Sequence, residues 1–239
     1  MKDDLGTRMK TQYEQRTRTF LPRRTYTMIR LDGKAFHTFT RGMDRPYDER
    51  FMYAMDYTAM HLCLEIQGAV MAYVQSDEIS ILLTDFDKIT TDAWFDGQVQ
   101  KIVSVSASMA TAFFNEYINH DVQRMNHKRA FFDARVFTIP DPVEVENYFV
   151  WRQKDAVRNS LAMHAQSLYS HKKLHGKSQA DMHDMIHEAG ENWNDLPDGF
   201  KRGRTIAVGP LTGKWENDTP DFLKERFILS GLIPKIIYE

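Results

Sequence analysis

Cysteine, long apolar runs and targeting patterns are nearly absent from this chain of 239 residues. The single cysteine, Cys63, cannot form an internal disulfide, and its place on the apolar face of a predicted helix favours a buried structural thiol. No apolar run approaches the roughly 20 residues that span a bilayer, and the N-terminus lacks a signal-peptide pattern. We therefore expect a cytoplasmic protein with no membrane partner.

Common nucleotide-binding and hydrolase motifs are also missing, since no Walker loop, Rossmann glycine motif or G-x-S-x-G elbow occurs. The net charge of −2 does not by itself suggest a nucleic-acid binder. The distribution is uneven, because residues 1–30 hold eight basic and three acidic residues, whereas residues 76–96 hold six acidic and one basic. A basic surface can bind phosphate groups, and clustered acidic residues can lie near a bound cation. Taken one by one, however, most of these charged residues are explained as solvent-exposed positions on helices and loops.

Hydrophobic residues make up 42% of the sequence, enough for a core, and the length suits one domain or a domain with an appendage. Their spacing predicts a β-α-β-β-α-β order, the ferredoxin-like α+β arrangement with an antiparallel sheet. A polar helix is expected over the first twenty residues. The predicted strands cover residues 26–31, 70–75, 79–83 and 131–139, and the helices between them residues 52–66 and 99–117.

Composition changes after Pro140, and the rest of the chain reads as a mainly helical appendage. We therefore expect a palm-like catalytic domain with an N-terminal helix over residues 1–139 and a helical region over 140–239. Two histidine pairs in this region, His171/His175 and His183/His187, have the i, i+4 spacing that suits zinc. No acidic or cysteine partner accompanies them, so the zinc interpretation is weak. The expected helices are Val143–Trp151, Val157–Leu174 and Gln179–Ala189.

Two acidic turns follow strands that the predicted topology makes parallel. Asp32 ends the first strand, directly before Gly33, and the turn Ser76-Asp77-Glu78 ends the second. A strand–helix–strand crossover brings these ends to one edge of the sheet, so the carboxylates should converge if both strands flank the third. Paired aspartates can hold magnesium together with substrate phosphates. The competing interpretation is that they are turn and cap residues, because Asp-Gly is a common turn.

His37 follows the first of these turns and has two interpretations. It could act as a general base or phosphate donor, or it could be a histidine packed in the turn.

Ten residues in this region, Arg30-Leu31-Asp32-Gly33-Lys34-Ala35-Phe36-His37-Thr38-Phe39, resemble the R-x-D-G-x-x-F-H-x-F motif of the tRNA-histidine guanylyltransferase family. The resemblance continues along nearly the whole chain. Its further segments are Arg45-Pro46-Tyr47-Asp48, Gln75-Ser76-Asp77-Glu78-Ile79-Ser80, Phe132-Asp133-Ala134-Arg135, Trp151-Arg152-Gln153-Lys154-Asp155, Asn192-Trp193-Asn194 and Phe200-Lys201-Arg202-Gly203.

This resemblance implies a polymerase-like palm that adds nucleotides to the 5′ end of a tRNA, with ATP and GTP as substrates. Asp32, the Gly33 carbonyl and Asp77 would hold two Mg²⁺ ions, and Glu78 would support them. A tetramer built from two dimers is also implied. The nucleotide-binding residues would be Asp32, Gly33, Lys34, Ala35, Phe36 and His37 with Ser76 and Asp77.

Three departures from the family pattern favour its guanylyltransferase-like branch, which extends tRNA 5′ ends by template-dependent 3′–5′ polymerisation. An H-I-N-N-L-Y-N segment of the eukaryotic enzymes is replaced at residues 157–163, an arginine pair by Gly97-Gln98, and a lysine by Met182. The same resemblance makes Lys10, Arg30, Arg152 and Asn159 candidate phosphate or RNA contacts. Two other functions are a palm-type nucleotidyl cyclase, and an RNA-binding module with a degenerate metal site.

Overall fold

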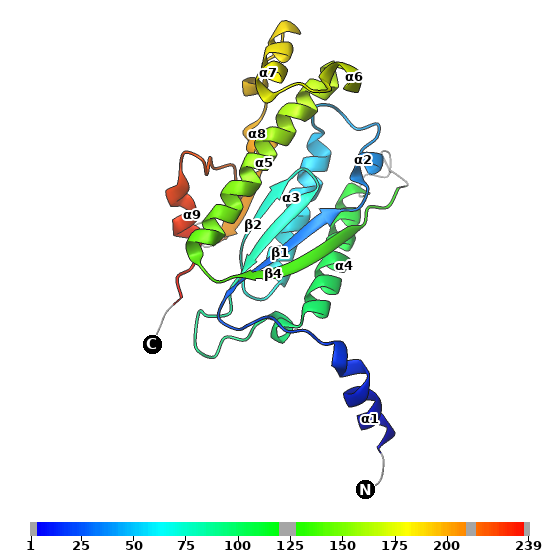
Figure 1. Cartoon of the computed structure of the whole chain (residues 1–239), viewed down its shortest axis with the longest axis vertical. Helices are drawn as coiled ribbons and strands as arrows, with labels where there is room; N and C mark the ends of the chain where they lie inside the picture. The colour runs from blue at the N-terminus through cyan, green and yellow to red at the C-terminus, as the bar shows by residue number, and fades with distance from the viewer. Residues whose placement is uncertain (1–3, 120–127, 209–213, 237–239) are drawn as a thin grey trace.

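The computed structural model describes residues 4–119, 128–208 and 214–236, and within them one antiparallel sheet has the strand order β4-β1-β3-β2-β5-β6. Helices α3 and α4 lie on one face of this sheet, and α5 crosses the other (Figure 1). The strands are β1 Tyr26–Gly33, β2 Ala69–Gln75, β3 Glu78–Leu83, β4 Phe132–Ile139, β5 Arg204–Val208 and β6 Trp215–Asp218. The α-helices are α1 Leu5–Gln12, α2 Phe36–Phe39, α3 Glu49–Glu65, α4 Val99–Ile118, α5 Pro142–Leu168, α6 His171–Leu174, α7 Gln179–Glu188, α8 Asp198–Arg202 and α9 Arg226–Leu232. Short 3₁₀ helices are η1 Glu14–Thr17, η2 Trp94–Gly97 and η4 Trp193–Asp195.

The predicted β-α-β-β-α-β order is confirmed in β1 to β4. Strand β3 lies between β1 and β2 and pairs antiparallel with both, so β1 and β2 are parallel to each other. Their carboxyl ends therefore reach the same edge of the sheet. The α+β palm-like fold that the sequence predicted is present.

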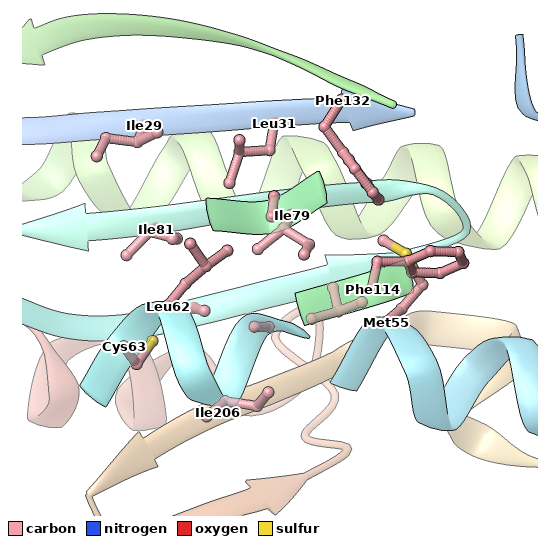
Figure 2. Close-up of a cluster of buried hydrophobic side chains, with 14 of the residues drawn as sticks. Ile29, Leu31, Met55, Leu62, Cys63, Ile79, Ile81, Phe114, Phe132 and Ile206 are labelled. Atoms are coloured by element: carbon pink, nitrogen blue, oxygen red, sulfur yellow. The ribbon is translucent and has the colours of Figure 1, made fainter. Parts of the chain in front are cut away.

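Alternating side chains give the sheet two buried faces, as the period of two along a strand requires. One face packs on α3 and α4 and includes Ile29, Leu31, Ile79 and Ile81 (Figure 2). The opposite face packs on α5 and the C-terminal segment through Met28, Tyr73, Leu82, Phe149 and Phe222. Both faces of the sheet are therefore apolar and must be packed against other elements. On the second face, α5 covers only part of the sheet.

Cys63 belongs to the first of these cores, and burial raises the pKa of its thiol to about 12. The predicted structural thiol is thus confirmed. In the described residues, no helix is both long enough and apolar enough to cross a membrane.

Helix α5 differs from the prediction, which placed two helices over this stretch. The structure has one helix of 27 residues. Asp141 caps its N-terminus by accepting from Val143 N at 2.7 Å, and Pro142 occupies a first-turn position where its missing N–H is harmless. No glycine or proline interrupts residues 152–156, so nothing in the local sequence ends the helix there.

The C-terminal region contributes two strands that the sequence analysis did not expect. Strand β5 pairs with β2, and β6 pairs with β5, so one sheet spans the predicted boundary at residue 140. Both strands are short, and four or five residues carry too little periodicity to separate a strand from a helix. At the other end, the expected N-terminal helix is present but shorter, as α1 and η1, and it projects from the body (Figure 1).

The core position Leu62 provides a test of this packing. Leu62 is fully buried on α3, whereas Leu64 on the same helix is 57% exposed. Leu62→Ala should lower the free energy of unfolding by about 2–5 kcal/mol because it leaves a cavity. Leu64→Ala should change it by less than about 0.5 kcal/mol. Urea denaturation followed by circular dichroism measures both, and equal effects would contradict the assigned orientation of α3.

Candidate functional site

The two acidic turns meet at the carboxyl edge of the sheet. Asp32 lies directly opposite Glu78 in the register of β1 and β3. The backbone N–H of Gly33 donates to the carbonyl of Asp77 at 3.0 Å, which ties the first turn to the second. Ser76 has a φ of 46°, so the chain reverses within two residues between β2 and β3. The convergence predicted from topology is therefore observed.

Gly33 fits this corner because it lacks a Cβ. A Cβ built on Gly33 would lie 2.3 Å from Cδ2 of Phe36, far inside van der Waals contact. Phe36 itself is 3% exposed and packs against Phe114 and Phe132, so its ring serves mainly as core. The next residue after this tight contact, His37, is exposed.

A cavity of about 500 Å³ opens beside the two turns. This volume is in the range of small-molecule sites. Of the residues predicted to bind a nucleotide, Gly33, Ala35, Phe36, His37, Ser76 and Asp77 line it, whereas Asp32 and Lys34 do not. Among the candidate RNA contacts, only Asn159 lines it.

Several lining residues were not assigned to the site from the sequence. The ring of Tyr47 lies 5.2 Å from that of Phe200, and together they join the loop before α3 to α8. Asp48 caps α3 by accepting from Phe51 N at 2.9 Å. The segment Arg45-Pro46-Tyr47-Asp48 carries part of the family resemblance but was given no role in the site, because its place in the pocket depends on contacts distant in sequence. Further lining residues that sequence reasoning missed are Met43, Met163, Gln166 and Arg204.

Asp77 is the electrostatically perturbed group of the site. Burial is the main cause that raises its pKa to about 6, and the nearby Asp32 carboxylate raises it further. The carboxylates of Asp32 and Asp77, with the Gly33 carbonyl, are an all-oxygen donor set of the kind that fits a hard cation such as Mg²⁺.

A cation here would need further ligands from a substrate. In the residues that the structure describes, no group of three or more His, Cys, Asp or Glu side chains is placed to hold a metal ion. The two histidine pairs considered for zinc therefore form no such group. Two carboxylates completed by phosphate oxygens and water are the usual way in which Mg²⁺ is bound beside nucleotides.

Glu78, which the resemblance places in support of the metal site, is a buried ion-pair residue. It is 5% exposed, and Arg152 donates two hydrogen bonds to its carboxylate, from Nε to Oε1 at 2.8 Å and from Nη2 to Oε2 at 2.9 Å. Arg30 Nη2 adds a second ion pair to Oε2 at 2.6 Å. Both oxygens are thus engaged by guanidinium groups, so the geometry gives Glu78 a positioning role beside the aspartates.

The same ion pairs bear on two expected RNA contacts. The side chain of Arg152 is 4% exposed and that of Arg30 is 20% exposed, and both point to Glu78. This placement favours a structural role for both over direct contact with RNA. Arg152 also contacts Asp155 at 2.8 Å, and Asp155 accepts from Asn159 at 3.4 Å, so the network reaches the pocket wall.

Lys10 does not join this site within one chain. It lies on α1, which projects from the end of the molecule opposite α6 and α7 (Figure 1). Any contact between Lys10 and a substrate in the pocket would need a long RNA or another copy of the chain.

Comparison with known proteins identifies the family. A model described as tRNAHis guanylyltransferase matches residues 6–140, more than half of the chain. The chain belongs to the tRNA(His) guanylyltransferase family. Members of this family are nucleotidyltransferases, which confirms the enzyme class that the resemblance implied.

Several relatives cover almost the whole chain of this family member. The tRNA(His) guanylyltransferase of Schizosaccharomyces pombe is 28% identical over 95% of this chain and 90% of its own. A bacterial guanylyltransferase-like protein solved with ATP is 44% identical, with a TM-score of 0.89 over 96% of this chain and 99% of its own. Another such structure, solved with GTP, is 40% identical, with a TM-score of 0.81 over the same shares. Nucleotide binding is therefore a property of similar members of the family.

The Arg152–Glu78 pair should matter for stability. Arg152→Met leaves a buried carboxylate short of one partner and should lower the free energy of unfolding by about 3 kcal/mol. Arg158→Met is the control, because Arg158 is 61% exposed and pairs only at the surface with Asp155, for a cost below about 1 kcal/mol. Chemical denaturation of both variants measures the difference, and similar values would contradict a buried role for Arg152.

The raised pKa of Asp77 means that its ionised carboxylate lowers the free energy of unfolding. At pH 7 the carboxylate is ionised in both states, so Asp77→Asn should stabilise the metal-free protein by about 1–2 kcal/mol. Since the folded form holds the proton more tightly, this gain should shrink as the pH falls from about 6 towards 4. Thermal or urea unfolding between pH 4 and 8 without Mg²⁺ measures it, and a loss of stability at pH 7 would contradict the prediction.

Proposed function

We propose that this protein is a template-dependent 3′–5′ nucleotidyltransferase that adds nucleotides to the 5′ end of tRNA. The observation that carries this proposal is the meeting of Asp32 and Asp77 beside a nucleotide-sized pocket in a member of this family. In this reaction the 5′ monophosphate attacks the α-phosphate of ATP or GTP and releases pyrophosphate, and the 3′-hydroxyl of the incoming nucleotide then attacks the activated 5′ phosphate and releases AMP or GMP.

The incoming nucleotide would bind in the pocket. Ala35, His37, Ser76 and Asp77 line it, and the exposed side chain of Lys34 lies next to this wall in sequence. Similar family members have been solved with ATP and with GTP, which supports nucleoside triphosphates as substrates here.

Asp32, Asp77 and the Gly33 carbonyl are the groups that would hold two Mg²⁺ ions, and such ions lower the pKa of an attacking hydroxyl and stabilise the leaving oxygen. The protein's own part is to hold these oxygens in place. The Gly33–Asp77 hydrogen bond fixes the two turns, and Glu78, held by Arg30 and Arg152, fixes the strand that follows Asp77.

Templated addition is favoured over fixed guanosine addition because of where the departures from the family lie. Residues Asn159, Ser160 and Met163, within the replaced segment 157–163, line the pocket. Gly97 and Met182 lie outside the lining, on η2 and α7. In this wall Asn159 matches the family pattern, whereas Ser160 and Met163 stand where the family has asparagine. Val157 and Ala162, at the positions of the family's histidine and tyrosine, do not line the cavity. This altered wall supports selection of the nucleotide by pairing with an RNA template.

Two other functions have less support. A nucleotidyl cyclase would share the paired aspartates but would not need RNA, and the family assignment speaks for a tRNA substrate. An RNA-binding module with a lost metal site would not need to retain both Asp32 and Asp77. A cytoplasmic location and a homotetramer of two dimers complete the proposal.

The deciding experiment supplies Mg²⁺, ATP, all four nucleoside triphosphates and a tRNA that lacks its first 5′ nucleotide. The nucleotide opposite the gap is changed through all four bases. Added nucleotides should follow the template base by Watson–Crick pairing, and a chelator should stop the reaction. Addition of guanosine against every template base would contradict templated repair.

Asp32→Ala and Asp77→Ala should each lower the extension rate by at least about 100-fold, since each removes a metal ligand. Asp87→Ala is the matched control, because Asp87 is an exposed carboxylate outside the pocket. Gel-resolved extension under single-turnover conditions measures the rates. A near-normal rate in either pocket variant would reject the assigned metal role.

A further inference from the structure

An exposed tryptophan lies next to the site without being part of the pocket. Trp151 is 52% exposed on α5, whereas tryptophan side chains are on average highly buried. It does not line the cavity beside Asp77. Its exposure therefore needs an explanation other than nucleotide binding in that cavity.

The indole ring is held by fixed neighbours. The guanidinium of Arg152 lies over it, 4.3 Å from the ring centre, and Arg152 is itself held by Glu78 and Asp155. Tyr148 meets the ring edge-to-face at 5.8 Å and 67°, and its hydroxyl is 2.8 Å from Ser80 Oγ. A large aromatic surface is thus oriented before any ligand arrives, which lowers the entropic cost of binding.

The sheet beside Trp151 is open to solvent. Asp133 and Arg135 of β4 pair with Asp32 and Arg30 of β1, so all four side chains face the side of the sheet that α5 crosses. The side chains of Asp133 and Arg135 are 60% and 56% exposed. In Figure 1, α5 leaves this part of β1 and β4 uncovered.

Basic side chains accompany the tryptophan on this side. Lys154 is exposed one turn further along α5, and Arg158 is 61% exposed one turn beyond that. Arg135 adds a third cation on the open strand. An exposed aromatic ring between cations is the combination by which proteins bind single-stranded or terminal nucleotides, with bases stacked and phosphates neutralised.

The cavity and the open face of the sheet are formed by different residues. The cavity is lined by the Gly33 and Ser76-Asp77 turns, whereas Asp32 and Trp151 are absent from its lining. A nucleotide in the cavity and an RNA end on the open sheet would therefore reach the aspartates from separate sides. The contacts Trp151–Arg152 and Arg152–Glu78 connect the exposed ring to Glu78, the residue that follows Asp77.

We propose that Trp151 is a stacking platform for the 5′-terminal base of the RNA substrate, with Arg135, Lys154 and Arg158 as phosphate contacts. This inference rests on the proposed function, because it assigns the RNA side of the same reaction. The platform places the end to be extended against the open strand that carries Asp32, while the cavity remains available to the incoming nucleotide.

The experiment uses the full-length protein and an RNA acceptor-stem duplex whose 5′-terminal base is the fluorescent adenine analogue 2-aminopurine. Trp151→Leu keeps apolar volume but removes the aromatic face, and Trp151→Phe retains an aromatic face. Phe227→Ala on α9 is the control, since Phe227 is 73% exposed and lies outside the cavity. Fluorescence titrations without nucleoside triphosphate measure RNA binding, and separate titrations measure binding of GTP.

Binding to the wild type should quench the 2-aminopurine, and Trp151→Leu should relieve that quenching and weaken RNA binding roughly 5- to 100-fold. Trp151→Phe should restore most of both, and Phe227→Ala should match the wild type. Affinity for GTP should stay within about twofold in all variants, because Trp151 does not line the cavity.

Other outcomes overturn the inference. Equal RNA affinity and quenching in wild type and Trp151→Leu would reject stacking, and a parallel loss of GTP affinity would move Trp151 into the nucleotide site. A change in sedimentation without a change in RNA binding would make this face a contact between copies of the chain. If the wild type bound no RNA at all, the proposed function itself would fail, which distinguishes the two claims.

Discussion

The buried carboxylate of Glu78, held between the guanidinium groups of Arg30 and Arg152, is the constraint on which the site depends. It joins β1, β3 and α5 at one point, directly beside Asp77 and opposite Asp32. A buried charge is tolerated only when its partners are complete, so these three elements have little freedom to move separately. Asp32 and Asp77 remain partly exposed, whereas the neighbouring Glu78 carboxylate is buried and forms the ion pairs that hold the strands and α5 together.

This arrangement leaves the pair Asp32 and Asp77 accessible from two sides of the sheet edge. On one side lies the cavity that the loop before α3, the middle of α5 and α8 enclose. On the other side, the strand of Asp32 and its neighbour β4 remain open next to Trp151. The proposed reaction joins a nucleotide to an RNA end and so needs two substrates at one pair of aspartates, and the incomplete cover by α5 leaves a second approach on which the proposed RNA end would bind.

Much of the fold was predictable because β1 to β4 and the helices between them are long enough to show their periods. From that order alone, the parallel relation of β1 and β2 and the meeting of Asp32 with Asp77 could be deduced. The continuous α5 was also within reach of the sequence, because no helix breaker occurs at residues 152–156. The strands β5 and β6 were not, because β5 is held by pairing with β2 and β6 by pairing with β5 rather than by their own sequence.

The sequence by itself determined the family, the palm topology and the pair of aspartates, because these follow from local motifs and hydrophobic periodicity. Only the tertiary structure decided the roles of neighbouring charges. From the sequence, Glu78 was expected to support the metal site and Arg30 and Arg152 to contact RNA, yet in space the two guanidinium groups form ion pairs with the Glu78 carboxylate inside the protein. The reason is physical: whether a charged side chain meets solvent, substrate or a counter-charge depends on burial and distance, which residues 74 positions apart acquire only on folding.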